Sequence, residues 1–236
     1  LKNKLHTFSV KPFVLKTEEG SGSRGVRVIS SEKDHIFVKK EFSALRNTRF
    51  LIEEFIRGEE ISIEAFIYKS KFNYYCFAIR DIELIANGNL IEHGSIFDPN
   101  YDKKKITQIK KVFEKACLSL GLNEGPVKGD IFFTISGPKV IEVAARSAPL
   151  APIISKDIYG FDMISNHIKW SMGEELNFKT KLKNINLLKP VCHKYLLHRK
   201  GILNNVTGIN KAKKSRGIIR LILLKNLEYP LKLKEP

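Results

Sequence analysis

The segment that most constrains the fold is a glycine- and serine-rich stretch between two short apolar runs near the N-terminus. Residues 13–16 read Phe-Val-Leu-Lys, residues 20–25 read Gly-Ser-Gly-Ser-Arg-Gly, and residues 26–29 read Val-Arg-Val-Ile. The apolar runs predict two strands joined by a loop. Glycine backbone N–H groups and serine hydroxyls can converge on a polyphosphate, and a lysine at the end of the strand adds a point charge. The candidate phosphate-binding residues are Lys16, Gly20, Ser21, Gly22, Ser23 and Gly25.

A flexible hairpin loop with no ligand is the alternative, because glycine-rich loops are common. The segment is neither a Walker A loop nor a dinucleotide fingerprint, since no helical pattern opens after it. The rest of the chain must therefore decide between the two interpretations.

The composition is that of a soluble globular protein with one large domain or two small ones. The chain has 236 residues, 43% of them hydrophobic and 28% charged, with no apolar run near the length of a membrane span. Three widely spaced cysteines predict buried thiols and a cytoplasmic location. The net charge of +16 raises the question of nucleic acid. The lysine clusters at 103–105 and 211–216 lack interleaved aromatic residues, so we expect a solvated lysine surface that attracts anionic ligands, and no nucleic-acid partner.

An apolar run at 50–52 leads into Glu53-Glu54, and after Gly58 the chain alternates. Ile61, Ile63 and Ala65 fall on one face of the predicted strand, whereas Glu60, Ser62 and Glu64 fall on the other. A row of acids on a strand either faces solvent or lines a cleft.

Two later strands, predicted at 126–134 and 139–143, carry Asp130 and Glu142. Antiparallel pairing about Gly137-Pro138 would bring the two carboxylates to neighbouring positions, where they would suit Mg²⁺. The alternative for Glu142 is a half-buried acid with a structural partner. The loop that follows the second strand projects Arg146.

Other elements complete the expected organisation. They are a helix over 31–45 capped by Ser31, strands over 72–84 and 89–95 around Asn87-Gly88-Asn89, a helix over 103–120 capped by Asp102, a helix over 158–172 with Phe161, Ile164, His167, Ile168 and Trp170 in the core, a linker over 179–189, and strands over 192–197 and 218–224.

The order and spacing of these features over residues 8–224 resemble the ATP-grasp superfamily. Residues 137–146 match the family stretch Gly-Pro-x-x-hydrophobic-Glu-x-x-x-Arg, and residues 200–219 are similar to the C-terminal lobe of its amino-acid ligases. The resemblance implies an α+β ATP-grasp fold. It divides the chain into a small lobe over 1–57, a large lobe with the metal site over 58–180, and a small C-terminal lobe over 190–236, with the nucleotide between the first two.

The resemblance also implies a role for each matching residue. Lys16 would contact the phosphates of ATP above the glycine loop. Glu53 would accept from the adenine amino group, Glu60 would bind the ribose hydroxyls, and the adenine edge would meet the backbone at residues 54–56, which are Glu54, Phe55 and Ile56.

The same resemblance assigns Asp130 and Glu142 to Mg²⁺, with Mn²⁺ as an alternative, and Arg146 to the phosphoryl group in transit. Arg146 and Lys16 would be the catalytic cations. Many family members have asparagine where Ala144 stands, so one metal ligand is expected to be absent or replaced by water. The family's upstream phosphate lysine and N-terminal domain find no match. We therefore expect a core fragment that turns over poorly by itself.

The function implied is an ATP-dependent ligase that activates a carboxylate as an acyl phosphate for attack by an amine. Two alternatives stay open: an ATP-grasp carboxylase or carbamoyl-phosphate-synthase-like enzyme that uses bicarbonate, and a non-catalytic basic module that only binds nucleotide. The expected partners are small-molecule carboxylates and amines and the missing N-terminal domain, without a membrane, and a homodimer is left open.

Overall fold

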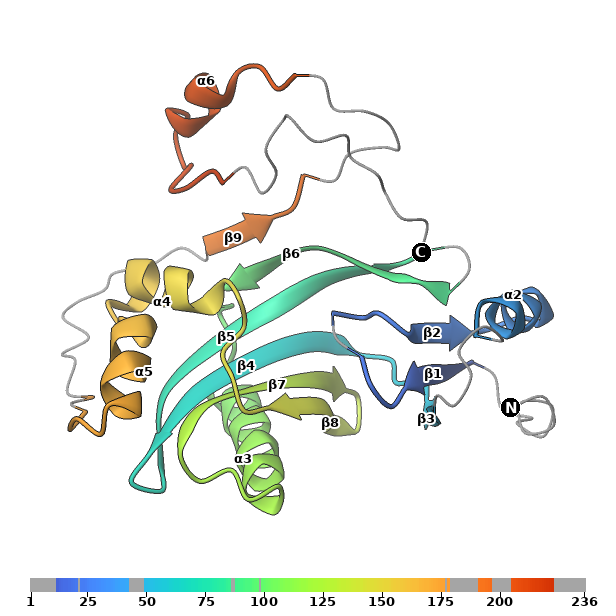
Figure 1. Cartoon of the computed structure of the whole chain (residues 1–236), viewed down its shortest axis with the longest axis horizontal. Helices are drawn as coiled ribbons and strands as arrows, with labels where there is room; N and C mark the ends of the chain where they lie inside the picture. The colour runs from blue at the N-terminus through green and yellow to red at the C-terminus, as the bar shows by residue number, and fades with distance from the viewer. Residues whose placement is uncertain are drawn as a thin grey trace. The chain divides into compact units, whose positions relative to one another are not determined.

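The computed structural model describes residues 12–20, 22–42, 49–85, 88–97, 99–176, 178, 191–196 and 205–222. The chain divides into two compact units, Leu1–Tyr195 and Leu196–Pro236, and each is described by itself. The first unit mixes helices with two antiparallel sheets, so the α+β class is confirmed (Figure 1).

The smaller sheet has three strands in the order β2-β1-β3. They are β1 (Phe13–Thr17), β2 (Val26–Ile29) and β3 (Phe50–Glu54). Helix α2 (Glu32–Phe42) covers the sheet and buries Val38 against Leu15 and Ile29. The predicted cap is present, because the Ser31 hydroxyl accepts a hydrogen bond from the Asp34 backbone N–H at 3.2 Å. Residues 43–45, the predicted end of this helix, lie outside the described residues.

The larger sheet has six strands in the order β8-β7-β4-β5-β6-β9, and every neighbouring pair is antiparallel. They are β4 (Glu59–Tyr68), β5 (Lys71–Leu84), β6 (Leu90–Phe97), β7 (Gly125–Thr134), β8 (Gly137–Ala144) and β9 (Val191–Lys194).

The connection between β5 and β6 reaches the smaller sheet. Gly88 has φ +73°, and a Cβ there would lie 2.2 Å from the carbonyl oxygen of Val28 in β2. Only glycine accepts both this backbone conformation and this close approach. Asn87 of the predicted turn lies outside the described residues.

Helix α3 (Lys103–Ser119) covers one face of the larger sheet. Asp102 caps it by accepting from the Lys105 backbone N–H at 2.8 Å, as predicted. Phe113 and Ile109 pack there with Ile61 and with other apolar residues of the strands. The predicted alternation of β4 is therefore confirmed on its apolar side, and the acidic side faces away from α3.

The helix predicted over 158–172 is wrong in its extent. The structure has α4 (Ala151–Tyr159), which ends at Gly160, and α5 (Met163–Ser171). Phe161 between them is buried as predicted. Ile164, His167 and Ile168 were expected in the core but are exposed. A short helix at the edge of the fold buries only a narrow side. Here Met163 is buried and Trp170 is half-buried, with its ring edge-on to that of Phe66 at 6.0 Å between centroids.

Strand β9 extends the larger sheet, because it pairs with β6 from Gly94↔Lys194 to Phe97↔Val191. The sequence-based division placed these residues in the C-terminal lobe. The three cysteines are thiols, but Cys192 is exposed, contrary to the prediction of buried thiols, since it lies on the outward face of an edge strand.

The second unit contains α6 (Ile209–Lys213). Residues 218–222 form no regular element, so the strand predicted over 218–224 is not found in its described part. The predicted linker over 179–189 and the strand end at residue 197 lie outside the described residues. None of the helices in the described ranges is long and apolar enough to cross a membrane.

Candidate functional site

A cavity of about 830 Å³ lies between the smaller sheet and the polar face of the larger sheet. Its size is typical of pockets for small organic ligands. The strand that carries Lys16 and the strand that carries Glu142 both contribute to its wall, so the two regions singled out in the sequence share one cavity.

The cross-strand register explains why polar groups gather on this face. Ser62 of β4 lies opposite Asp130 of β7, and Asp130 lies opposite Glu142 of β8. Directly opposed residues of an antiparallel pair point to the same side of the sheet. The predicted pairing of the two carboxylates is thus observed.

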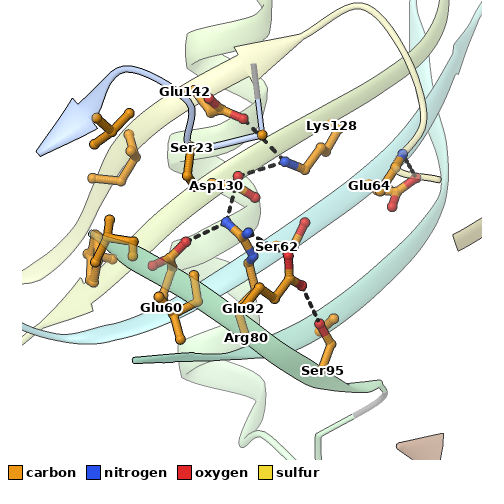
Figure 2. A pocket seen from close by; sticks show the side chains of 18 of the residues that line it. Ser23, Glu60, Ser62, Glu64, Arg80, Glu92, Ser95, Lys128, Asp130 and Glu142 are labelled. Atoms are coloured by element: carbon orange, nitrogen blue, oxygen red, sulfur yellow. Dashed lines mark hydrogen bonds and ion pairs between the residues drawn. The ribbon is translucent and has the colours of Figure 1, made fainter. Parts of the chain in front are cut away.

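Arg80 is the centre of an ion-pair network in the cavity (Figure 2). Its Nη1 atom is 2.5 Å from Glu60 Oε1 and 3.2 Å from Asp130 Oδ2, and its Nη2 atom is 3.0 Å from Glu92 Oε2. The Arg80 side chain is only 16% exposed. Burial alone would lower the pKa of Arg80, but Asp130, Glu60 and Glu92 raise it above its usual value, so this cation stays charged. Burial is also the main reason why the pKa of Glu60 is raised, although Arg80 opposes the shift.

Lys128 connects the two paired carboxylates. Its ammonium lies 2.6 Å from Asp130 Oδ2 and 3.3 Å from Glu142 Oε1. The other carboxylate oxygen of Asp130, Oδ1, is shielded from solvent and has no hydrogen-bond partner among the described residues. A buried carboxylate oxygen without a partner is costly.

Glu64 anchors the segment that carries Arg146. It is 3% exposed, and its Oε2 atom accepts from the Ala148 backbone N–H at 3.1 Å. Burial raises the pKa of Glu64 to about 8. The residue therefore holds a proton over much of the range from acidic to neutral pH, and its bond to Ala148 places the loop next to β4.

The smaller sheet contributes a simpler arrangement. Lys16 forms an ion pair with Glu53 at 2.6 Å, and Lys139 reaches Glu54 at 3.0 Å. Gly25 closes the glycine loop with φ +79°, and a Cβ there would lie 2.3 Å from the Thr17 hydroxyl. This position requires glycine for both conformation and space.

A family model for the ATP-grasp domain matches residues 1–148, which is more than half of the chain. The chain belongs to the ATP-grasp family.

Known ATP-grasp proteins resemble this domain in sequence and fold. A phosphoribosylamine–glycine ligase from Methanococcus maripaludis is 26% identical over 173 residues, covering 62% of this chain and 38% of the relative. Dapdiamide A synthase from Enterobacter agglomerans is 25% identical over 166 residues, covering 65% of this chain and 38% of the relative. The crystal structure of an L-amino acid ligase from Bacillus licheniformis superposes with a TM-score of 0.74 at 18% identity, covering 91% of this chain and 54% of that one. The chain thus spans well under two thirds of the length of these proteins.

Most residues that the sequence assigned to the ATP-grasp site lie on the cavity wall. Gly20 and Gly25 shape the loop without lining the cavity, and Ser21 lies outside the described residues. Their individual roles stay predictions. The predicted residues that line it are Lys16, Gly22, Ser23, Glu53, Glu54, Phe55, Ile56, Glu60, Asp130, Glu142 and Arg146.

Sequence reasoning missed the residues that connect these groups in the ATP-grasp domain. Arg80 and Lys128 each stand in a strand, where a single charged residue does not indicate whether it faces solvent or a ligand site. The alternation along β4 does not by itself show which residues of the neighbouring strands share its polar face. No sequence pattern singles out His193, yet β9 brings it opposite Ser95 at the cavity. Both ring nitrogens of His193 are shielded without a partner in the described part of the chain, and burial lowers its pKa.

Proposed function

We propose that this chain is the nucleotide-binding part of an ATP-dependent ligase, which joins a carboxylate to an amine. The observation that carries the proposal is the single cavity in which an ATP-grasp domain brings Lys16, the Asp130–Glu142 pair and Arg146 together from two facing sheets. Two relatives of this chain are named a ligase and a synthase, which supports C–N bond formation.

The proposed reaction has two steps. A carboxylate oxygen attacks the γ-phosphorus of ATP, the bond between that phosphorus and the β–γ bridging oxygen breaks, and ADP leaves. An amine nitrogen then attacks the acyl phosphate, inorganic phosphate leaves, and the nitrogen loses a proton. Such phosphoryl transfer depends on positioning and on charge neutralisation more than on a protein nucleophile.

Lys16 and Arg146 supply mobile positive charge for this chemistry. Lys16 would exchange its ion pair with Glu53 for the phosphates, which leaves the Glu53 carboxylate for the adenine amino group. Glu60 would accept from ribose hydroxyls while Arg80 keeps it in place. The strand end at residues 54–56 would meet the adenine edge.

Asp130 and Glu142 fit a divalent cation. The unpartnered Asp130 Oδ1 and the Glu142 carboxylate, 56% exposed, offer oxygen ligands next to each other. No third histidine, cysteine or acid completes a cluster with them within the described ranges, so nucleotide and water oxygens would fill the shell. When bound, Mg²⁺ or Mn²⁺ would neutralise charge on the phosphate oxygens.

We also propose a cytoplasmic location, because ATP is the co-substrate and the three cysteines are thiols. The lobe boundaries at 1–57, 58–180 and 190–236 belong to the same proposal, as do the carboxylate and amine partners.

Calorimetry with a non-hydrolysable ATP analogue tests the nucleotide site, and ADP release with panels of amino acids and bicarbonate tests the reaction. We expect binding that depends on Mg²⁺ in the wild type and much less so in Glu142→Gln, whose side chain has the same shape without the charge. Glu124→Gln, in an exposed loop, is the matched control. Absence of nucleotide binding by the wild type contradicts the proposal, and ADP release stimulated by bicarbonate alone favours a carboxylase.

A further inference from the structure

The Lys128 ammonium occupies a position between the two carboxylates assigned to the metal (Figure 2). It lies 2.6 Å from Asp130 Oδ2 and 3.3 Å from Glu142 Oε1. The Lys128 and Asp130 side chains are only 10% and 5% exposed, so this is a shielded contact and not a surface ion pair. A lysine ammonium carries one positive charge and can bridge two carboxylates much as a metal ion would.

The two oxygens of Asp130 differ in what they contact. Oδ2 already receives hydrogen bonds from Lys128 and, at 3.2 Å, from Arg80. Oδ1 is shielded from solvent but has no partner among the described residues. One side of Asp130 is therefore satisfied by protein cations, and the other side is available to a metal ion.

The charges of the connected side chains also favour one metal ion beside Asp130 Oδ1 and protein cations beside Oδ2. Four carboxylates, those of Glu60, Glu92, Asp130 and Glu142, are joined through two cations, Arg80 and Lys128. The formal charge of these protein groups is −2 with all six ionised, so a divalent ion at Asp130 Oδ1 and Glu142 meets a net negative environment. A second ion would have to take Oδ2 from Lys128 and place more positive charge beside Arg80, which is unfavourable in a shielded site.

We propose that Lys128 takes the place of one metal ion, so that this site binds a single divalent cation with each nucleotide. The inference rests on the proposed function and specifies the stoichiometry of its metal. Lys128 acts as a positioning residue that keeps Asp130 and Glu142 together and directs the metal to their remaining oxygens. Removing its charge leaves Asp130 Oδ2 with Arg80 as its one protein cation and takes the cation from Glu142 Oε1, which makes a second ion less unfavourable there.

Equilibrium dialysis of the full chain with Mn²⁺ and a non-hydrolysable ATP analogue measures the metal and the nucleotide that the protein retains. We expect about one Mn²⁺ per nucleotide in the wild type and about two in Lys128→Met. Lys128→Arg keeps the charge and should stay near one. Lys194→Met is the matched control, because it removes a lysine paired with Asp81 where both side chains are more than half exposed.

The outcomes separate this inference from the proposed function. A wild type that retains no nucleotide overturns both. Two Mn²⁺ per nucleotide in the wild type, or one in Lys128→Met, overturns the inference alone. If Lys128→Met does not fold, Lys128→Gln is measured in its place. If neither variant folds without metal, Mn²⁺ is added to both. Recovery of the folded state by Mn²⁺ supports the proposal that a metal ion can replace the Lys128 ammonium, and failure to recover contradicts it.

Discussion

The two walls of the cavity hold their charged groups in different ways. On the smaller sheet, Lys16 meets Glu53 in one ion pair, and their side chains are 20% and 41% exposed. On the larger sheet, Arg80 contacts three carboxylates with its side chain 16% exposed. A single, partly exposed pair loses one contact when it exchanges partners, whereas a shielded network loses several contacts when one member is removed. We infer that the smaller sheet provides exchangeable ligand contacts and that the larger sheet provides a charge framework on which the fold itself depends.

The strongest test of this comparison is Arg80→Met. The substitution leaves Glu60, Glu92 and Asp130 without their shared cation in a shielded site. We expect the free energy of unfolding to fall by about 3–5 kcal/mol, measured by urea denaturation at neutral pH. Arg80→Lys keeps a positive charge and should lose less of the free energy of unfolding than Arg80→Met. A loss below about 1 kcal/mol, the size expected for a surface pair, would show that the network does not support the fold.

The raised pKa of Glu64, on the larger sheet, predicts that the stability of the protein depends on pH. Its pKa is raised from 4.5 to about 8 in the folded protein, so between these values the folded state holds a proton that the unfolded state has released. Stability should therefore fall as pH rises through this window, by at most about 1.4 kcal/mol per pH unit.

Urea midpoints compared at about pH 5 and about pH 8 measure this slope. Glu64→Gln should flatten it, because glutamine does not titrate, while Glu124→Gln at an exposed position should keep it. An equal slope in the wild type and in Glu64→Gln would contradict the assignment.

On the smaller sheet, Lys16→Ala should weaken binding of the ATP analogue by roughly 1.5–3 kcal/mol, because it removes a charge-assisted contact to phosphate. Its effect on adenosine should be small. Glu60→Ala, in contrast, should weaken adenosine and ATP alike, since Glu60 is assigned to ribose. Calorimetric affinities that are the same for the wild type and both variants would place the nucleotide elsewhere.

The smallest expected effect is that of Lys16→Ala on stability. Loss of a single, partly exposed ion pair should change the free energy of unfolding by less than about 1 kcal/mol. If urea denaturation shows a loss as large as that of Arg80→Met, the contrast between the two sheets fails.

Local patterns predicted the parts of this protein that depend on neighbours in sequence. The strands at β1 and β2 follow from apolar runs on either side of a glycine loop, and the cap of α3 follows from Asp102 before a helical period. The alternation along β4 correctly separated the face packed on α3 from the polar face. The inner side of α5 could not be predicted, because all its apolar residues are compatible with burial and only the packing of Trp170 against Phe66 decides which side is inside.

The sequence by itself determined the family, the α+β class and the opposition of Asp130 to Glu142, because each rests on short-range order and one hairpin register. Only the tertiary structure decided which charges meet. Arg80 is 50 residues from Asp130 along the chain, and it reaches Asp130 because β5 and β7 both flank β4. A charged residue in a strand has the same local pattern whether it faces water or a cavity. The partners that distinguish the two cases come from strands whose order is set by the packing of the whole sheet.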